Sequence, residues 1–591
     1  MERGLRAHLA RARAHPRRRA PDRLRGRRAA RALEQRGRAR RRPAPARGRH
    51  DLDGQRDHRP RGRARGRARR RRGADRLAGR RADRRRGGRR TAGDDQLRGH
   101  LRHLPAGAAG VRAHVNLSER LLDAPSVRAV RDALAGGEEA WIVGGAVRDA
   151  AGERSVTDLD LAVAGDEATA ARRIARAVGG PAFELSAEFG TWRALAPDRS
   201  WHADVSRLRG PGIEADLEGR DFTVNAIALP LADLDAAPLD PHGGLADAAD
   251  RVLRTVSERS FGDDPLRLLR AARLAAELDY ELDPETIALG RRAASQAGEP
   301  AGERQLAELR LLVAGPDPLR ALALLDELGA TEGVLPELAA LRGVEQNPNH
   351  HLDVHGHTLE VLANLLAVER DLDRYAGDSA PEVAALLAEP LADELTRGGA
   401  LRFAAVLHDV GKPATRRERE DGFVSFVGHD RVGAAMVAEI CARLRASRAL
   451  ARQLELLTVH HLHLGFMAAE RPLGRRRLYD YLRLTAPVAA DVTLLTVADR
   501  LAARGGGPTA SPEMVEAHLK LAREVLPAAL AWHRDGPPRG PIRGDELARA
   551  LGIEPGPELG RLLAEIEAAV FTGEVETAEQ AIRLAERLFD E

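Results

Sequence analysis

The sequence is poor in cysteine and in aromatic residues. Cys441 is the single cysteine among 591 residues, so the chain cannot form an internal disulfide or a cluster of thiolate ligands. Aromatic residues make up only 3% of the chain, and no run approaches the roughly 18 consecutive apolar residues that a membrane-spanning helix needs. These shortages exclude a disulfide-stapled secreted domain and a helical membrane protein. We therefore expect a cytoplasmic protein without a membrane partner.

Lysine is also scarce, since it occurs only at Lys412 and Lys520, and the remaining positive charge is unevenly distributed. Residues 1–114 contain 40 arginines and 10 acidic residues, a net charge of +30, whereas the remainder carries a net charge of −24. This first segment has few large apolar residues and no helical or strand period, so we predict that it is disordered. It is either a basic RNA-binding arm or the product of a mis-assigned start codon on a GC-rich gene.

The residues between 141 and 163 predict a strand, a glycine turn, a helix and a second strand. The apolar residues 141–143 stop at Gly144 and Gly145. Glycine has no Cβ, so the backbone of such a turn can approach a ligand closely, and the N–H groups of the following helix suit phosphate oxygens. Arg148 could add a bidentate phosphate contact.

The second strand carries two aspartates that point to the same face, because Asp158 and Asp160 are two residues apart. Carboxylates are ligands that Mg²⁺ prefers, and two ions would stabilise both the attacking and the leaving oxygen of an in-line displacement. Asp204, on a predicted strand at 202–205, is a candidate third carboxylate, with an ordinary solvated aspartate as the alternative. In this order and spacing, the motifs favour nucleotidyl transfer over a glycine turn followed by two solvated aspartates.

The residues GGAVRD at 144–149, followed by DLD at 158–160, resemble the head domain of class II CCA-adding tRNA nucleotidyltransferases and bacterial poly(A) polymerases. These enzymes belong to the DNA polymerase beta superfamily. The resemblance implies that the paired aspartates bind the catalytic metals and that the glycine turn holds the triphosphate. Strands that alternate with helices after residue 164 predict a small mixed sheet, an α+β head.

A further motif, RDFTVNAIAL, predicts a helix at 221–229 whose polar start presents Arg220, Asp221 and Asn225. Arginine can neutralise a triphosphate, and aspartate and asparagine can bond a ribose hydroxyl. The motif resembles the family's pattern except at its first position, where Gly219 replaces an arginine. This departure weakens the expectation of a second basic contact there.

The segment 260–277 predicts one continuous amphipathic helix with Pro265 in its first turn, where the missing N–H costs little. Its polar face holds Asp264, Arg267 and Arg270, and ion pairing on a solvated face would also explain these residues. In the family that the motifs resemble, an aspartate and an arginine at the positions of Asp264 and Arg267 bind the base edge. Protein side chains then choose C or A, and Arg270 matches a second nucleotide-binding arginine.

Histidines and aspartates in the order H, HD, H, H, D predict a second catalytic constellation. They are His357, His408, Asp409, His429, His460 and Asp499. This order resembles the HD phosphohydrolase superfamily, which implies a metal ion bound by the first histidine, the HD pair and the last aspartate. Such mixed ligands suit Mn, Fe, Ni, Co or Zn. Lys412 could contact phosphate, and His429 and His460 are either additional phosphate contacts or part of a second metal site.

We therefore predict an α+β head followed by an all-α neck, HD domain and tail. The boundaries are 1–114 for the arm, 115–258 for the head, 259–346 for the neck, 347–507 for the HD domain and 508–591 for the tail. Within these parts, ERQLAEL at 303–309 resembles a motif that braces the neck, and 371–397 is an insertion without a recognisable role. The segment 544–563 predicts two helices joined by a turn that contacts an RNA phosphate or simply packs.

The resemblance implies a template-independent tRNA nucleotidyltransferase that adds C and/or A from CTP and ATP, with Mg²⁺ at the head and HD hydrolase activity. Three alternatives remain open. The enzyme could be a poly(A) polymerase of the same family or add only CC or only A. It could be an HD phosphohydrolase whose head merely binds nucleotide. A non-catalytic RNA-binding protein would need a broken metal site, and both sites have their residues.

Overall fold

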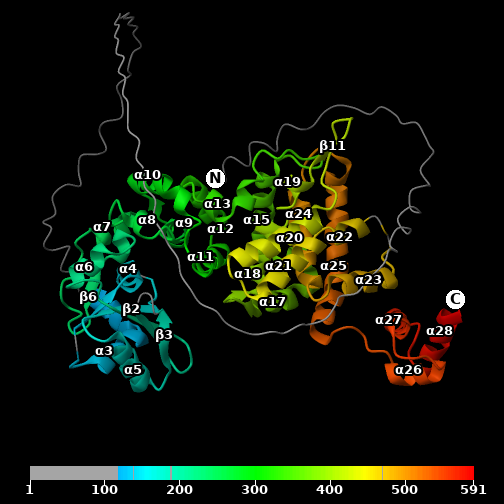
Figure 1. The fold of residues 1–591 in the computed structure, drawn as a ribbon, viewed down its shortest axis with the longest axis horizontal. Coiled ribbons are helices and arrows are strands. Elements are labelled where there is room, and N and C mark those ends of the chain that lie inside the picture. The colour runs from blue at the N-terminus through cyan, green and yellow to red at the C-terminus, as the bar shows by residue number, and fades with distance from the viewer. Residues whose placement is uncertain are drawn as a thin grey trace, which may run out of the picture. The chain divides into compact units, whose positions relative to one another are not determined.

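The computed structural model describes residues 117–590, apart from 138, 153, 157, 187–189, 469 and 471 (Figure 1). The predicted basic arm, residues 1–114, lies outside the described residues. Among the described residues, no single helix is long and apolar enough to cross a membrane, and only the bent pair of α23 (Arg475–Thr485) and α24 (Ala489–Ala502) reaches that length and apolarity.

The head is built on a six-stranded mixed sheet in the order β3-β4-β5-β2-β1-β6. Its strands are β1 (Ala140–Val143), β2 (Asp158–Val163), β3 (Ala182–Ser186), β4 (Thr191–Leu195), β5 (His202–Arg207) and β6 (Ala228–Pro230). The central strands β2 and β5 run parallel and place Asp160 opposite Asp204, while the other neighbours are antiparallel. The predicted strands and the predicted mixed sheet are therefore confirmed.

The two faces of this sheet are covered differently. Helices α3 (Pro125–Leu134) and α5 (Glu167–Val178) pack on one face through Ile142, Leu161 and Val205. Among the residues that the structure describes, the other face is covered only near β1 and β6, where α6 (Ile213–Glu218) contributes to a small core. Residues 117–123 are also helical, and the glycine turn leads into α4 (Gly145–Ala151). The face that carries the three aspartates is therefore partly open.

The helix predicted at 221–229 is wrong. The chain instead forms one 3-10 turn, η1 (Thr223–Asn225), between the bridge residue Phe222 and strand β6. The apolar residues Phe222, Val224 and Ile227, in this turn and on either side of it, are fully buried without a helix. Gly244, at the start of α7 (Gly244–Asp250), packs against the carbonyl of Thr223, where a Cβ would lie 2.0 Å from the oxygen. This close packing favours the compact turn over a helix.

The single helix predicted at 260–277 is also wrong, because it is divided into α8 (Ser260–Asp263) and α9 (Arg267–Leu278). Pro265 disfavours the helical conformation of the residue before it, and Asp264 accordingly has extended angles, φ −149° and ψ 99°. The rest of the neck is helical apart from β8 (Glu281–Leu282), which pairs with β7 (Val252–Leu253) at the end of the head. Its elements are α10 (Pro284–Ala293), η2 (Ala294–Gln296), α11 (Gly302–Ala314), α12 (Pro318–Glu327), α13 (Thr331–Val334) and α14 (Pro336–Ala339).

The region from 354 to 504 is a helical domain whose buried residues form one cluster with those of the neck and of α25 (Pro512–Asp535). Its helices are α15 (Val354–Arg370), α16 (Leu372–Ala376), α17 (Ala380–Ala388), α18 (Arg397–Leu407), α19 (Lys412–Thr415), α20 (His429–Arg443), α21 (Arg448–His460), α22 (His463–Met467), α23 and α24. Short elements are η3 (Gly377–Ser379), η4 (Pro508–Ala510), and the hairpins β9 (Pro390–Ala392)–β10 (Leu395–Thr396) and β11 (Arg417–Glu418)–β12 (Val424–Ser425).

The tail consists of α26 (Gly544–Leu551), α27 (Pro557–Thr572) and α28 (Ala578–Asp590), with a small core of its own. The two helices and the turn predicted at 544–563 are present. The tail contacts α23 through the ion pair of Arg476 with Glu565 and the hydrogen bond from Tyr479 to the carbonyl of Ala564. The predicted fold class, an α+β head followed by helical parts, is confirmed.

Candidate active sites

The glycine turn lies against the first catalytic candidate, Asp160. Gly144 has a φ of +71°, and a Cβ on it would lie 2.6 Å from a carboxylate oxygen of Asp160. Only glycine fits this conformation and this approach. Asp160 remains open to the pocket, yet the protein atoms crowded around it and the charge of Asp204 raise its pKa.

The two other aspartates of the sheet each have a partner that sequence analysis missed. Nδ1 of His202 lies 2.8 Å from Oδ1 of Asp158. This hydrogen bond lowers the pKa of Asp158 and raises the pKa of His202. Arg193, on β4, binds both oxygens of Asp204 at 2.7 and 2.8 Å. The structure therefore brings three carboxylates onto one face, as predicted from the strand periodicity. The alternation of His202 with Asp204 was the available signal for the histidine.

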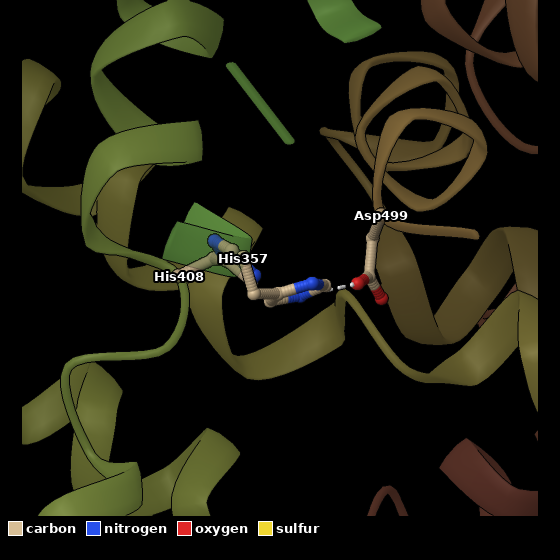
Figure 2. Close-up of side chains that lie close together, drawn as sticks. All are labelled: His357, His408 and Asp499. Carbon is tan, nitrogen blue, oxygen red and sulfur yellow. Dashed lines mark ion pairs between the residues drawn. The ribbon is translucent and has the colours of Figure 1, made fainter. Parts of the chain in front are cut away.

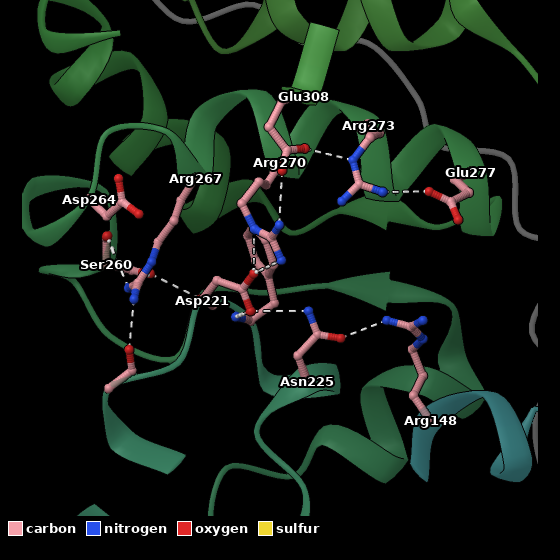
Figure 3. Close-up of polar contacts among 12 residues, drawn as sticks. Arg148, Asp221, Asn225, Ser260, Asp264, Arg267, Arg270, Arg273, Glu277 and Glu308 are labelled. Carbon is pink, nitrogen blue, oxygen red and sulfur yellow. Dashed lines mark hydrogen bonds and ion pairs between the residues drawn. The ribbon is translucent and has the colours of Figure 1, made fainter. Parts of the chain in front are cut away.

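A chain of buried polar contacts joins the glycine turn to the neck (Figure 3). Arg148 donates to both oxygens of its neighbour Asp149 and, at 2.6 Å, to the side-chain oxygen of Asn225. Asn225 donates to Asp221 at 3.0 Å, and Asp221 accepts from Arg270 of α9. Arg148 thus spends three of its five N–H groups on the protein. Arg148 therefore orders the glycine turn through Asp149 and Asn225.

Arg270 connects this series of polar contacts to the neck. Its guanidinium lies between Asp221 and Glu308 of α11, with contacts of 2.9 Å to each. Burial alone would raise the pKa of Asp221, but the charge of Arg270 lowers it to about 2. Glu308, which belongs to the motif predicted to brace the neck, also accepts from Arg273 at 2.7 Å. The braced network fixes Arg270 above the head.

Two pockets meet over this network. One has a volume of about 690 Å³ and is lined by the glycine turn, Asp158, Asp160 and Arg148. The other has a volume of about 710 Å³ and is lined by Asp264 and the neck arginines. Arg220, Asp221 and Arg270 line both. A ligand with an anionic end and a polar, flat end would span the two.

The residues predicted to bind the base lie together in the second pocket. Asp264, released from the helix by Pro265, pairs with Arg304 at 2.8 Å. Arg267 donates to the carbonyl of Gly219 at 2.7 Å and to the hydroxyl of Ser260 at 3.0 Å. Arg304 and Ser260 were not predicted, because their partners are distant in sequence or depend on the helix break. Arg220 pairs with Asp216 at 3.0 Å and lies beside Gly144.

The helical domain brings a second group of titratable residues together at the ends of α15, α18 and α24. His357, His408 and Asp499 have ligand atoms within 4.8 Å of one another (Figure 2). The shortest contact is 3.0 Å between Nε2 of His357 and Asp499. Burial lowers the His408 pKa, but the carboxylate of Asp409 reverses this and raises it, whereas nearby imidazoles hold the pKa of Asp499 well below its usual range.

A second group of three lies beside the first, and its histidines differ from the predicted pair of His429 and His460. Asp409, His429 and His461 have ligand atoms within 4.8 Å, and Nε2 of His429 and His461 are 3.3 Å apart. His460 is not part of this group. Its ring lies edge to face with that of His463, with ring centroids 5.1 Å apart. Successive helical residues point about 100° apart, so His460 and His461 face different directions, and His461 is the one that faces Asp409 and His429. The sequence did not distinguish them.

The donor set fits divalent cations. Both ring nitrogens of His357 and Nε2 of His408 are buried and make no hydrogen bond within the described residues, although carboxylate oxygens lie close by. Convergent imidazole and carboxylate atoms without hydrogen-bond geometry are what a metal site requires. Lys412 approaches Asp409 at 2.6 Å and the unpredicted Gln346 at 2.7 Å.

Known protein families match the head, the neck, the helical domain and the tail as separate parts of the chain. Residues 140–254 match the poly A polymerase head domain and residues 354–504 the HD domain. Residues 279–341 match a probable RNA and SrmB-binding site of polymerase A, and residues 541–585 match a putative domain 2 of tRNA nucleotidyltransferase.

Curated relatives match along most of their length. The chain is 38% identical over 459 residues to an A-adding tRNA nucleotidyltransferase of Deinococcus radiodurans, covering 76% of this chain and 96% of that protein. It is 34% identical over 451 residues to a CC-adding tRNA nucleotidyltransferase of Thermus thermophilus, covering 75% and 92%. A solved CCA-adding enzyme complexed with CTP shares the fold, with a TM-score of 0.53 at 21% identity over 80% of this chain and 99% of that one. The chain belongs to the family of tRNA nucleotidyltransferases.

Proposed function

We propose that this protein adds C and/or A nucleotides from CTP and ATP to the 3′ end of tRNA without a nucleic acid template. The observation that carries the proposal is the pair Asp158 and Asp160 beside Gly144, in a pocket continuous with Asp264 and Arg267. As part of the same proposal, the protein works in the cytoplasm. The activities of the Deinococcus and Thermus relatives support this class of reaction.

The head supplies the reaction centre of this proposal. Asp158 and Asp160 would hold Mg²⁺, which stabilises charge on the attacking and leaving oxygens when it is bound. Asp204, clamped by Arg193, is poised as a third carboxylate on the neighbouring strand. The turn at Gly144 and Gly145 leaves room for the triphosphate, and Arg220 adds positive charge at its edge.

The neck supplies the selection of the base. Asp264 only accepts hydrogen bonds when it is ionised, whereas Arg267 only donates them. Cytosine and adenine both offer an amino donor beside a ring-nitrogen acceptor, so the same pair of side chains can serve both bases. Asp221 and Asn225, at the junction of the pockets, are placed to bond the ribose. Arg270 holds Asp221 in its ionised form.

The helical domain supplies a separate hydrolytic site in this proposal. His357, His408, Asp409 and Asp499 would hold one divalent transition metal ion, and Asp409, His429 and His461 a second. Such a site favours hydrolysis of phosphate esters, because bound cations supply Lewis-acid chemistry there. Lys412 is placed to neutralise the substrate phosphate.

The test uses three tRNA transcripts that lack the terminal CCA, the terminal CA or only the terminal A. Each is incubated with the pure protein and CTP, ATP, both, or UTP, and the products are sized. A CCA-adding enzyme extends all three by the missing residues, and an A-adding enzyme extends only the last, by one residue. Long A tracts on any transcript would identify a poly(A) polymerase. Failure to extend any transcript contradicts the proposal.

A further inference from the structure

We propose that Leu185, Thr191 and Arg209 form the subsite for the 3′-terminal nucleotide of the RNA that is extended. The inference rests on the proposed function and names where the second substrate lies. None of the motifs described above contains these three residues. They line the head side of the 710 Å³ pocket, opposite the neck residues Asp264 and Arg267.

The order of the strands fixes the direction from which the RNA must arrive. The glycine turn, which would hold the leaving pyrophosphate, follows β1, and the paired aspartates lie on the next strand, β2. In an in-line displacement the attacking oxygen lies opposite the leaving one. The attacking 3′-OH therefore approaches over β5, where Asp204 lies opposite Asp160. The rest of the terminal nucleotide must then lie over β4 and β3.

The sheet face at β4 and β3 is open and apolar in the right place. Phe183 pairs with Arg193, which pairs with Asp204, so these side chains and Asp160 form one row on one face. Phe183 and Leu185, both on the edge strand β3, are 42% and 45% exposed. Exposed apolar side chains beside a catalytic row are suited to the flat face of a base.

Arg209 supplies the charge that an RNA end requires. The other arginines of this pocket are engaged: Arg220 with Asp216, Arg267 with Gly219 and Ser260, Arg270 with Asp221 and Glu308, and Arg304 with Asp264. Within the described residues, the Arg209 guanidinium has no hydrogen-bond or ion-pair partner. Its Cδ lies 3.9 Å from where a Cβ of Gly219 would lie, an ordinary van der Waals distance, so the side chain runs alongside Gly219.

The size of the pocket agrees with two occupants. A volume of about 710 Å³ is within the range that holds an entire drug-sized ligand, and the incoming nucleotide places only its base there, against the neck. The carboxylates Asp263, Asp264 and Glu299 also lie on the neck side, where they disfavour a phosphate backbone. An RNA end with its base on Leu185 and a phosphate at Arg209 occupies the other side.

The kinetic test compares Leu185→Ser, Arg209→Ala and Arg209→Lys with the unmodified chain. Leu185 and Arg209 are both exposed, so the fold tolerates the changes. We expect the KM for tRNA to rise about tenfold in the first two variants, with the KM for CTP or ATP unchanged, and Arg209→Lys to restore part of the loss. The slope of log binding constant against log salt concentration for RNA should become shallower by about one in Arg209→Ala only.

Arg207→Ala is the matched control, because Arg207 is also exposed but pairs with Glu167 on the opposite face of the sheet. It should leave both KM values unchanged. A rise in the KM for the nucleotide with an unchanged KM for tRNA would assign these residues to the incoming nucleotide and overturn the proposal. Unchanged values for both substrates would overturn it as well.

A photocrosslink tests the subsite without relying on catalysis. An RNA acceptor stem with 4-thiouridine as its 3′-terminal base is bound to the full chain, irradiated and digested with trypsin. The expected crosslink is in peptide 177–193, which contains Leu185 and Thr191. A crosslink only in the neck or the tail contradicts the subsite, even if the protein adds nucleotides. A protein that crosslinks as expected but adds no nucleotide contradicts the proposed function instead.

Discussion

The head site and the HD site use similar residue types in opposite environments. In the head, Asp158 has 63% of its side chain exposed, and arginines surround an open pocket. In the HD domain, the side chains of His357, His408 and Asp409 are 1% exposed or less. An open site is suited to a large, highly charged substrate, while a desolvated cluster of ligands binds cations tightly and admits a small reacting group. The comparison implies that the two sites work independently.

The largest expected effect is a loss of nucleotide addition at the head with hydrolysis at the HD site retained. Asp160→Ala removes a carboxylate from the proposed magnesium site, and loss of several kcal/mol of charge stabilisation corresponds to about a thousandfold slower nucleotide addition. Rates of addition with saturating CTP and ATP measure it. Hydrolysis of a model phosphomonoester by the HD site should stay within about twofold, and equal loss of both activities would show that the sites are coupled.

The converse change breaks the HD site alone. His408→Ala should reduce phosphomonoester hydrolysis by about a thousandfold, because the residue is fully buried among the proposed metal ligands. Nucleotide addition in the same preparation should persist, with a rate near that of the unmodified chain. A chelator followed by dialysis into Mg²⁺ alone should reproduce this pattern. If addition were lost with hydrolysis, the separation of the two sites would be wrong.

A smaller effect sharpens the boundary of the HD site. His461→Ala should remove one bound transition metal ion per chain, as measured by elemental analysis, since His461 belongs to the second group of ligands. Its neighbour His460 provides the matched control, because His460→Ala removes a buried histidine outside that group. Burial lowers the pKa of His461 to about 3, so the imidazole is neutral and able to bind a cation at neutral pH. Equal metal loss in both variants would contradict the assignment.

The smallest effect concerns the turn of the head. Arg148→Lys keeps the charge but loses the fork that holds Asp149 and Asn225. The KM values for CTP and ATP should rise together, by about five- to tenfold, because the turn serves the triphosphate common to both. Steady-state kinetics with each nucleotide measure this. A change confined to one nucleotide would place Arg148 in base selection.

Sequence patterns predicted the parts whose geometry is local. The two-residue period of β2 placed Asp158 and Asp160 on one face, and an apolar helix ending in His408 and Asp409 marked the second site. The long-range partners of these residues escaped prediction. Arg193 and Arg304 contact Asp204 and Asp264 only after distant elements pack, and nothing in the local pattern distinguishes them from solvated arginines.

The errors have local physical causes. The sequence pattern predicts Pro265 in the first turn of a helix, but Pro265 disfavours the helical conformation of Asp264, which instead lines the pocket. The apolar spacing around Val224 suits a helix, but packing of Gly244 on the Thr223 carbonyl holds a tight turn. For His460 and His461, the position of the last helical turn decides which imidazole faces the metal ligands, and that position follows from tertiary packing.

In the proposed reaction, protein side chains at the neck choose the base that the head transfers. The most direct measurement compares kcat/KM for the correct nucleotide with kcat/KM for UTP, as a ratio. The acceptor is the tRNA transcript whose 3′ end requires that correct nucleotide as its next residue. In the unmodified chain this ratio should approach about 10⁴, since mismatched polar groups at a built site are strongly rejected. Arg267→Ala and Asp264→Ala should each reduce it by at least about tenfold while addition persists. An unchanged ratio in both active variants would contradict the claim.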